Sequence, residues 1–127
     1  MLGSKDAVAT IAVTSMARAA LFYEGILGFE RSHTMGPSAT AYKSGRTSFF
    51  VYESAFAGTN KATAATWNVG PDIEVIVDDL RRKGVTFEHY RLPDTRLEGD
   101  VHVSDEGRVA WFKDPDGNIL NLVNQTM

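Results

Sequence analysis

Apolar residues follow two different spacings along the chain, and these spacings predict alternating strands and helices. Residues 7–13 (AVATIAV) form a short apolar run between polar residues, which is typical of a buried strand. A helix is predicted next, because Ser15 can cap it, apolar residues recur every three or four positions up to Leu27, and Gly28 can end it. Three strand-like segments separated by turn-forming residues then follow, at residues 29–34, 39–43 and 47–53.

The same order starts again after residues 54–62, which have the composition of a linker. Residues 63–69 (TAATWNV) are strand-like, and Pro71 fits the first position of a helix. The run EVIV at residues 74–77 could also form a strand, but apolar spacing that continues to Leu80 and the basic ending RRKG favour a helix. The remaining strand-like segments are residues 85–90, 108–113 and 118–124, with Asp116-Gly117 as a hairpin turn between the last two.

The order of strand, helix and three strands thus occurs twice, although the two halves share little residue identity. This order points to an α+β fold, in which helices pack on one face of antiparallel sheets and leave the other face uncovered. We predict a single domain over residues 1–127, with module one at about 7–53, a linker at 54–62 and module two at about 63–125. The functional site is expected on the uncovered face.

Composition and charge exclude several classes of function. The chain is 43% hydrophobic and 23% charged, and none of its apolar runs approaches the roughly 18 residues that a membrane helix needs. It contains no cysteine, which excludes thiolate nucleophiles, disulfides and Cys-ligated zinc. A net charge of −3 gives no electrostatic basis for nucleic-acid binding. The N-terminus lacks the pattern of a secretory signal, so we expect a cytoplasmic protein without a membrane or nucleic-acid partner.

Acid–base candidates are few. Asp100 and His102 would share one face of a strand, where a carboxylate can orient a histidine as a general base; the alternative is a solvated hairpin. His89 is predicted to point either to the uncovered face or to solvent, and Tyr23 is a further candidate acid or base. The polar residues 91–105 predict a surface loop or a mobile flap. Neither a nucleophile elbow nor a phosphate-binding glycine pattern occurs, so no nucleotide cofactor is expected.

Three motifs carry a family resemblance that extends over nearly the whole chain. They are FYEGILGFE at residues 22–30, LRRKGVTFE at 80–88 and AWFKDPDGNILNLVNQ at 110–125. These resemble the first helix and second strand, the end of the second helix and the last hairpin of the vicinal oxygen chelate superfamily, which includes glyoxalase I, bleomycin-resistance proteins and extradiol dioxygenases. The resemblance implies two βαβββ modules whose sheets form a curved cup with helices on its outer face, often in dimers.

Catalytic members of that superfamily usually hold a divalent metal in the cup with His, Glu or Gln side chains. The corresponding positions in this chain are Val8, Phe49, Ala64 and Asn121, none of which is a standard ligand. A shift by one residue exposes the opposite face of each strand and still gives no ligand set. The resemblance therefore implies a cup without a metal or other cofactor. A metal-dependent lyase or dioxygenase remains an alternative, with Glu88, His89 and His102 as its donors.

The same register directs small, apolar and aromatic side chains into the cup. We expect ligand contacts from seven residues: Val8, Thr10, Phe49, Ala64, Thr66, Trp111 and Asn121. Such a mixture is typical of a small-molecule site, and the aromatic rings can stack on a planar ligand. The predicted function is metal-free binding of a small apolar or aromatic ligand by a homodimer, as in the bleomycin-resistance branch. Two alternatives remain open: a catalyst that needs no metal, and a dimerisation module whose cup is filled by its own side chains.

Overall fold

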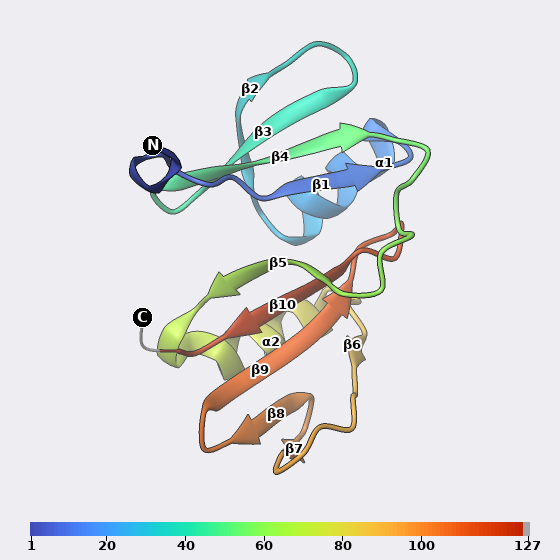
Figure 1. Cartoon of the computed structure of the whole chain (residues 1–127). Helices are drawn as coiled ribbons and strands as arrows, with labels where there is room; N and C mark the ends of the chain where they lie inside the picture. Colours follow the sequence, from blue (N-terminus) through green and yellow to red (C-terminus); the bar gives the residue numbers. More distant parts are fainter. Residues whose placement is uncertain (126–127) are drawn as a thin grey trace.

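A βαβββ module and a second module with the same order plus two further short strands, β6 and β7, make up the fold in a computed structural model that describes residues 1–125 (Figure 1). Residues 126 and 127, with which the predicted domain ends, lie outside this part. Module one contains β1 (Thr10–Val13), α1 (Met16–Ala20), η2 (Leu21–Ile26), β2 (Glu30–Thr34), β3 (Ala39–Ser44) and β4 (Thr47–Glu53), preceded by η1 (Leu2–Ser4). Module two contains β5 (Thr63–Asn68), η3 (Gly70–Asp72), α2 (Ile73–Arg82), β6 (Phe87–Glu88), β7 (Arg96–Glu98), β8 (Val101–Ser104), β9 (Gly107–Lys113) and β10 (Ile119–Val123).

Each module forms its own sheet, and the two sheets have matching strand orders. The orders are β1-β4-β3-β2 and β5-β10-β9-β8-β7, with β6 pairing on β9. Most neighbouring strands are antiparallel as predicted, but β1 pairs with β4, and β5 with β10, in parallel. In each module the helical crossover lets the strand after the helix run in the same direction as the first strand. An even number of reversals later the last strand again has that direction, so it pairs with the first strand in parallel. The predicted α+β class is confirmed.

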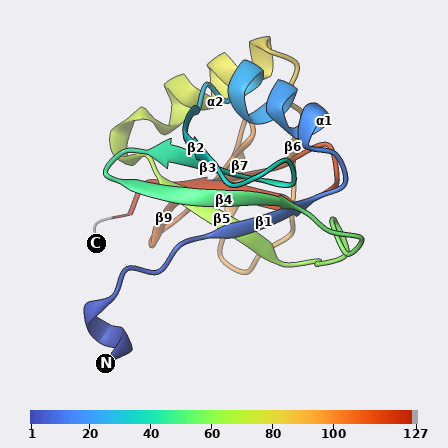
Figure 2. The same ribbon diagram turned by 90° about the horizontal axis from the view of Figure 1, so that it is seen from above.

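Both helices lie on the same side of the sheets, as Figure 2 shows, and the core lies beneath them. In β1, Ile11 and Val13 are buried toward the helices, whereas Thr10 and Ala12 point to the other side. Buried residues of both modules form one continuous core, and burying each large apolar side chain contributes about 1.5–3 kcal/mol. We call the side away from α1 and α2 the open face. No helix among residues 1–125 is long and apolar enough to cross a membrane.

The first helix has a mixed geometry. Ser15 caps it as predicted, because its hydroxyl oxygen accepts a hydrogen bond from Arg18 N at 3.2 Å. After Ala20 the α-helix continues as the π-helical turn η2, in which Leu27 N donates to Phe22 O at 2.9 Å. The apolar spacing predicted one continuous α-helix to Leu27. Apolar spacing alone does not distinguish a π-helical turn from an α-helical one. The EVIV segment is helical within α2, as predicted.

The region between α2 and β9 differs from the prediction. Only Phe87 and Glu88 of the predicted strand 85–90 are extended in the sheet. The segment predicted as a polar loop or solvated hairpin does form a hairpin, β7–β8, and β8 takes the place in its sheet that β2 takes in the first. Val101, His102 and Val103 are all buried there, so the solvated reading is wrong for this strand. The alternation of valines around the histidine is the strand signal that the surrounding charges obscured.

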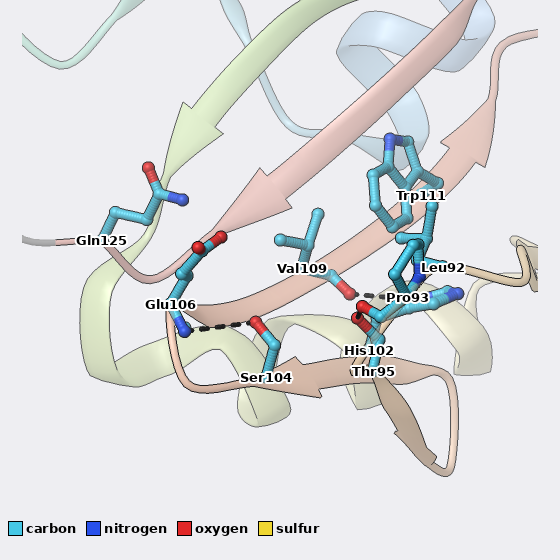
Figure 3. Close-up of a pocket in the computed structure, with 10 residues that line it drawn as sticks. Leu92, Pro93, Thr95, His102, Ser104, Glu106, Val109, Trp111 and Gln125 are labelled. Carbon is cyan, nitrogen blue, oxygen red and sulfur yellow. Dashed lines mark hydrogen bonds between the residues drawn. The ribbon is translucent and has the colours of Figure 1, made fainter.

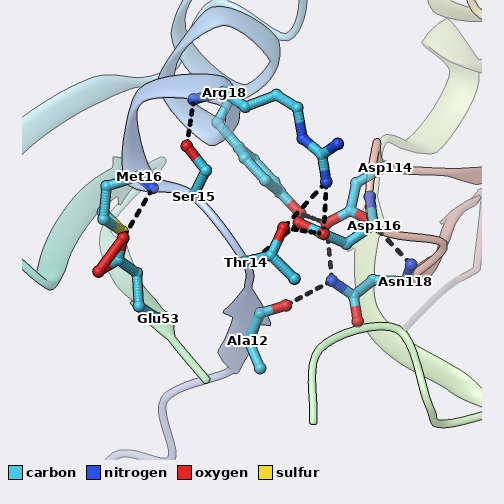
Figure 4. A network of polar contacts seen from close by, with 10 residues as sticks. Ala12, Thr14, Ser15, Met16, Arg18, Glu53, Asp114, Asp116 and Asn118 are labelled. Carbon is cyan, nitrogen blue, oxygen red and sulfur yellow. Dashed lines mark hydrogen bonds and ion pairs between the residues drawn. The ribbon is translucent and has the colours of Figure 1, made fainter. Parts of the chain in front are cut away.

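The last hairpin joins the two modules through the side chain of Asp114 (Figure 4). Its Oδ2 accepts hydrogen bonds from the Tyr23 hydroxyl and from Asn118 Nδ2, both at 2.8 Å. Its Oδ1 accepts from the backbone N–H groups of Asp116 and Asn118 at 3.0 and 2.9 Å. Asn118 Nδ2 also donates to the carbonyl oxygen of Ala12 in β1 at 2.7 Å. The turn is therefore fixed to module one by buried polar groups.

Asp116 makes a second connection from the same turn. Its carboxylate accepts from the Thr14 hydroxyl and from Arg18 Nη2, both at 2.6 Å, and from Thr14 N at 3.1 Å. The carboxylate side chain is 4% exposed, so this pair with Arg18 is screened less than an ordinary surface pair. Together, Asp114 and Asp116 hold the β9–β10 hairpin against the start of α1.

Candidate functional site

Aromatic rings gather around a pocket on the open face of the second sheet (Figure 3). Trp111 of β9 lies at one edge of this pocket, with the His102 ring edge-on at 4.9 Å and the ring of Tyr90, which is outside the lining, edge-on at 5.3 Å between centroids. The pocket has a volume of about 230 Å³. Its lining residues come from β8, β9 and two neighbouring segments: Leu92, Pro93, Thr95, His102, Ser104, Glu106, Gly107, Val109, Trp111 and Gln125. Part of the segment predicted as a surface loop or flap thus forms one wall.

Strand register explains why these side chains share a face. Trp111 lies opposite Asn121 in β10 and opposite Glu88 in β6, while His102 lies opposite Val109. Side chains directly opposite each other in a ladder project to the same side. The indole of Trp111 also reaches across β10, where its Nε1 donates to the Thr63 hydroxyl of β5 at 3.1 Å. One tryptophan therefore spans three strands of the open face.

His102 is a fixed neutral ring. The backbone N–H of Tyr90 donates to His102 Nε2 at 3.0 Å, so this nitrogen carries no proton, and Nδ1 lies 3.3 Å from the Val109 carbonyl oxygen to which it donates. Burial lowers the pKa of His102, and the nearby His89 lowers that pKa further against the opposing effect of the Val109 carbonyl. Because both nitrogens are occupied, the arrangement does not support His102 as a general base.

This burial gives a pH dependence of stability with a defined sign. A histidine whose folded-state pKa lies below its unfolded value of about 6.5 contributes stability that is fully present above that value. The contribution is lost as pH falls, because the unfolded chain then takes up a proton that the folded protein refuses. We therefore expect the free energy of unfolding to fall from about pH 7.5 to pH 5.5, and His102→Gln to fall less. Urea unfolding of both proteins at each pH measures this difference; equal pH dependence would contradict it.

Two buried polar atoms beside Trp111 have no hydrogen-bond partner within residues 1–125. They are the hydroxyl oxygen of Tyr90 and Oδ1 of Asn121. Tyr90 packs edge-on against Trp111. Asn121, only 8% exposed, lies directly opposite Trp111 in β10. Buried polar atoms are nearly always paired in native proteins, so an unpartnered pair at one aromatic centre needs an explanation.

The fold agrees with comparisons to known proteins. The sequence profile described as the Glyoxalase/Bleomycin resistance protein/Dioxygenase superfamily matches residues 6–122. The chain belongs to this superfamily. Comparison with curated protein sequences gave no match. The predicted resemblance is therefore confirmed at the level of the superfamily.

Solved structures with the same fold include fosfomycin resistance proteins. FosX from Listeria monocytogenes has a TM-score of 0.73 at 15% identity, covering 98% of this chain and 95% of that one. FosX from Mesorhizobium loti has a TM-score of 0.66 at 14% identity, covering 98% and 94%. An integron cassette protein from the mobile metagenome of Halifax Harbour sewage outfall has a TM-score of 0.70 at 20% identity, covering 94% and 97%. At these identities the likeness shows the superfamily fold alone.

Several predicted site residues do lie together on the open face. Thr66, Asn121 and Trp111 occupy opposing positions on β5, β10 and β9, so the structure brings these three together. Val8 and Thr10 are exposed at the start of the first sheet, away from the aromatic pocket. Ala64 lies at an irregularity between β5 and β10 and packs partly against the core. Tyr90 was not predicted, although its place two residues after Glu88 puts it on the same face.

Phe49 was predicted to face the cup, and this is wrong. It is buried on the helix side, with its ring 4.9 Å from Phe29 and 5.7 Å from Trp67. In the β1–β4 pair, Thr10 lies opposite Phe50 and Ile11 opposite Val51. Phe50 therefore faces the open side, and Val51 faces the helices together with Ile11. The sequence assignment was shifted by one residue in β4, which turns every side chain to the other face.

The remaining acid–base candidates serve other contacts. Asp100 pairs with His89 at 2.7 Å and with Arg81 Nη2 at 2.7 Å, so the expected Asp100–His102 pair does not form. Partial burial raises the pKa of Asp100, but hydrogen bonds from His89 and Arg81 outweigh this and lower that pKa. Burial, together with the Asp114 carboxylate, raises the pKa of Tyr23. Tyr23 therefore stays protonated in the joint between the modules, remote from the open face.

The donor residues do not fit a divalent metal. Among residues 1–125 no three His, Asp or Glu side chains come close enough to hold one. Glu88 pairs with Lys113 at 3.4 Å, His89 with Asp100, and His102 with backbone groups. Divalent metals of this kind take most of their binding energy from carboxylate or imidazole donors. Asn121 alone offers one amide oxygen, which is too weak a ligand to hold such an ion.

Proposed function

We propose that the protein binds a small planar apolar or aromatic molecule against Trp111 on the open face, without a metal. The observation that carries this proposal is the pair of buried, unpartnered polar atoms on either side of Trp111, from Tyr90 and Asn121. An unsatisfied buried polar group costs roughly 1–3 kcal/mol, which a ligand with a matching polar group would recover. Neither Tyr90 nor Asn121 lines the pocket itself, but both are neighbours of Trp111, which does, so a ligand would reach these atoms through a movement of the Trp111 side chain.

The size and chemistry of the pocket support a small ligand. At about 230 Å³ it is smaller than the roughly 300–1,000 Å³ of most drug-sized sites. Its walls combine apolar side chains and the rings of Trp111 and His102 with the polar side chains of Thr95, Ser104, Glu106 and Gln125. Ring stacking on Trp111 would contribute about 0.5–1.5 kcal/mol beyond buried area. Glu106 is the one carboxylate among the lining residues. These features favour a neutral aromatic compound over a strongly charged one.

The metal-dependent alternative has less support. One FosX structure is described as complexed with Mn(II) and 1S,2S-dihydroxypropylphosphonic acid, which makes a lyase-like or dioxygenase-like activity the natural competitor. Its donors here would be Glu88, His89 and His102, yet each of these contacts a different partner. If the proposal is right, Mn(II) leaves the melting temperature unchanged, since an ion that binds only the native state would raise it. A stoichiometric metal in the purified protein would refute the metal-free proposal.

We further propose a cytoplasmic homodimer, with the ligand site in each copy. The open face of the first sheet leaves Val8 and Tyr52 39% and 40% exposed, and a second copy would cover them. The dimerisation alternative, with a filled cup, predicts the same assembly without ligand binding. Light scattering on the Trp67→Phe protein measures its molar mass and so tests the proposed dimer separately from ligand binding.

Binding is tested with benzamide, a planar ring that carries both a hydrogen-bond donor and an acceptor. The Trp67→Phe protein retains Trp111 as its only tryptophan, and we expect a saturable change in its fluorescence on titration with benzamide. In that background, Tyr90→Phe should weaken binding about fivefold or more, since it removes a buried hydrogen-bonding partner. Tyr52→Phe, which removes a tyrosine hydroxyl from the first sheet and not from beside Trp111, is the matched control. No saturable change, or equal effects of the two substitutions, would contradict the proposal.

A further inference from the structure

A second cavity lies on the helix side of the sheets, between the two modules. Its volume is about 310 Å³. Phe112 and Leu122 line its floor and are the neighbours in sequence of Trp111 and Asn121, so the two sites occupy opposite faces of the same strands. Leu27 and Phe29 line it from module one, and Ile76 of α2 closes the other side. The cavity is independent of the site proposed above.

An ordered aromatic wall makes this cavity suitable for a ring. Phe29 and Trp67 are stacked at 5.5 Å with an interplanar angle of 30°, and Phe49 packs edge-on against both. The indole Nε1 of Trp67 donates to the Ser44 hydroxyl at 3.0 Å, so its polar atom is already satisfied. An apolar cavity of about 150 Å³ lined by Leu, Ile and Phe is known to hold benzene, and this one is larger.

The π-helical turn η2 leads into the opposite wall. Leu27, the residue that follows η2 and lines the cavity, donates its N–H to Phe22 O rather than to the carbonyl four residues back. Such turns are rarer than α-helix and are frequently found at functional sites. Here the turn sets the position of Leu27 relative to Phe29, so the local departure from α-helix shapes the cavity.

Asp79 is the one charged residue among those that line the cavity. It pairs with Lys83 at 3.0 Å, and both side chains are about half exposed. Exposed ion pairs of this kind contribute at most about 1 kcal/mol, so a ligand cation can replace the lysine without a large penalty. We propose that this cavity binds a small aromatic molecule with a positively charged substituent, its ring against Trp67 and its cation beside Asp79.

The test uses benzylamine and two ring compounds of similar size, toluene and benzoate. In the Trp111→Phe protein the only tryptophan is Trp67, and we expect its emission to change saturably with benzylamine. Benzoate should bind most weakly, because its charge opposes Asp79. Asp79→Asn should weaken benzylamine about two- to fivefold and leave toluene unchanged. Ile76→Phe should fill the cavity and weaken both benzylamine and toluene about tenfold or more.

Two outcomes would overturn this proposal: no saturable change with benzylamine, or the same loss of benzylamine and toluene affinity in Asp79→Asn. Far-UV circular dichroism checks that Ile76→Phe is folded, and Val69→Phe fills the same cavity if it is not. The readout is separate from the one used for the open face, where Trp111 reports in the Trp67→Phe protein. Failure at one site therefore leaves the result at the other site intact.

Discussion

Replacing Asp114 with alanine is expected to lower the free energy of unfolding by about 3–5 kcal/mol, because each buried donor left without an acceptor costs roughly 1–3 kcal/mol. The carboxylate accepts four hydrogen bonds, from the Tyr23 hydroxyl, the Asn118 amide group and two backbone N–H groups. A domain of this size is typically stable by only about 5–15 kcal/mol, so the loss is a large fraction. Urea unfolding followed by circular dichroism measures it.

Two further substitutions distinguish the loss of the Asp114 hydrogen bonds from a general effect of removing a charge on stability. Asp105→Ala removes an exposed carboxylate and should change stability by no more than about 0.5 kcal/mol. Tyr23→Phe removes one of the four donors together with its hydroxyl, so its cost should be smaller, about 1 kcal/mol. If Asp114→Ala costs no more than Tyr23→Phe, the carboxylate is not the centre of the network.

Element order and much of the open face were predictable from the sequence, because they depend on local spacing. The alternation in β10 places Leu120 and Leu122 toward the helices and Asn121 toward the open face, as predicted. Trp111 follows from the same alternation in β9. In both strands a turn of known type fixes the register at one end, so the facing of each side chain follows by counting.

Phe49 could not be placed in the same way. Its facing depends on how β4 pairs with β1, and these strands are joined through a helix and two other strands rather than by one turn. Both faces of β4 carry aromatic residues, Phe49 toward the helices and Phe50 toward the open side, so hydrophobicity does not distinguish them. Register was therefore decided by tertiary pairing, which the local sequence does not contain.

The partners of the ionisable residues were also beyond sequence reasoning. Asp100 and His102 are close in the chain, yet Asp100 turns to His89 and to Arg81 of α2, while His102 binds the backbone of Tyr90. These choices follow from the way β7 and β8 fold back beside α2. Proximity in the sequence suggested Asp100 and His102 as an acid–base pair. In the fold, Asp100 makes a partly exposed ion pair, whereas His102 is a buried ring.

The DPDGN motif that carried much of the resemblance holds the two modules together, and Asn121 of the candidate site follows three residues after it. Asp114, Asp116 and Asn118 all contact module one, whereas Asn121 lies opposite Trp111 on the open face. One hairpin thus fixes the position of the second sheet and presents an open-face residue. This division explains how the scaffold can be retained while the residues at the superfamily's metal positions differ.

Gly58→Ala should also destabilise the protein strongly, by about 2–4 kcal/mol, since a left-handed alanine costs about 1 kcal/mol and overpacking adds roughly 1–3. Gly58 has a φ of +71°, and a Cβ placed there would lie 1.8 Å from the carbonyl oxygen of Asp116. The clash is with backbone, so the turn itself must move, and Asp116 would lose its contacts with Thr14 and Arg18. The expected result is a lower midpoint of urea unfolding.

Gly45→Ala supplies the matched control for this effect. Gly45 also has a positive φ, +56°, but a Cβ there meets nothing within 4 Å. Its cost should therefore be the conformational part alone, about 1 kcal/mol. The excess cost of Gly58→Ala over Gly45→Ala isolates the close approach of the linker to the turn. Asp116→Ala is then added to each glycine variant. Its cost should be smaller in the Gly58→Ala background, where the contacts of Asp116 are already lost, than in the Gly45→Ala background. Equal costs for the two glycine substitutions would show that the linker does not hold the joint in place.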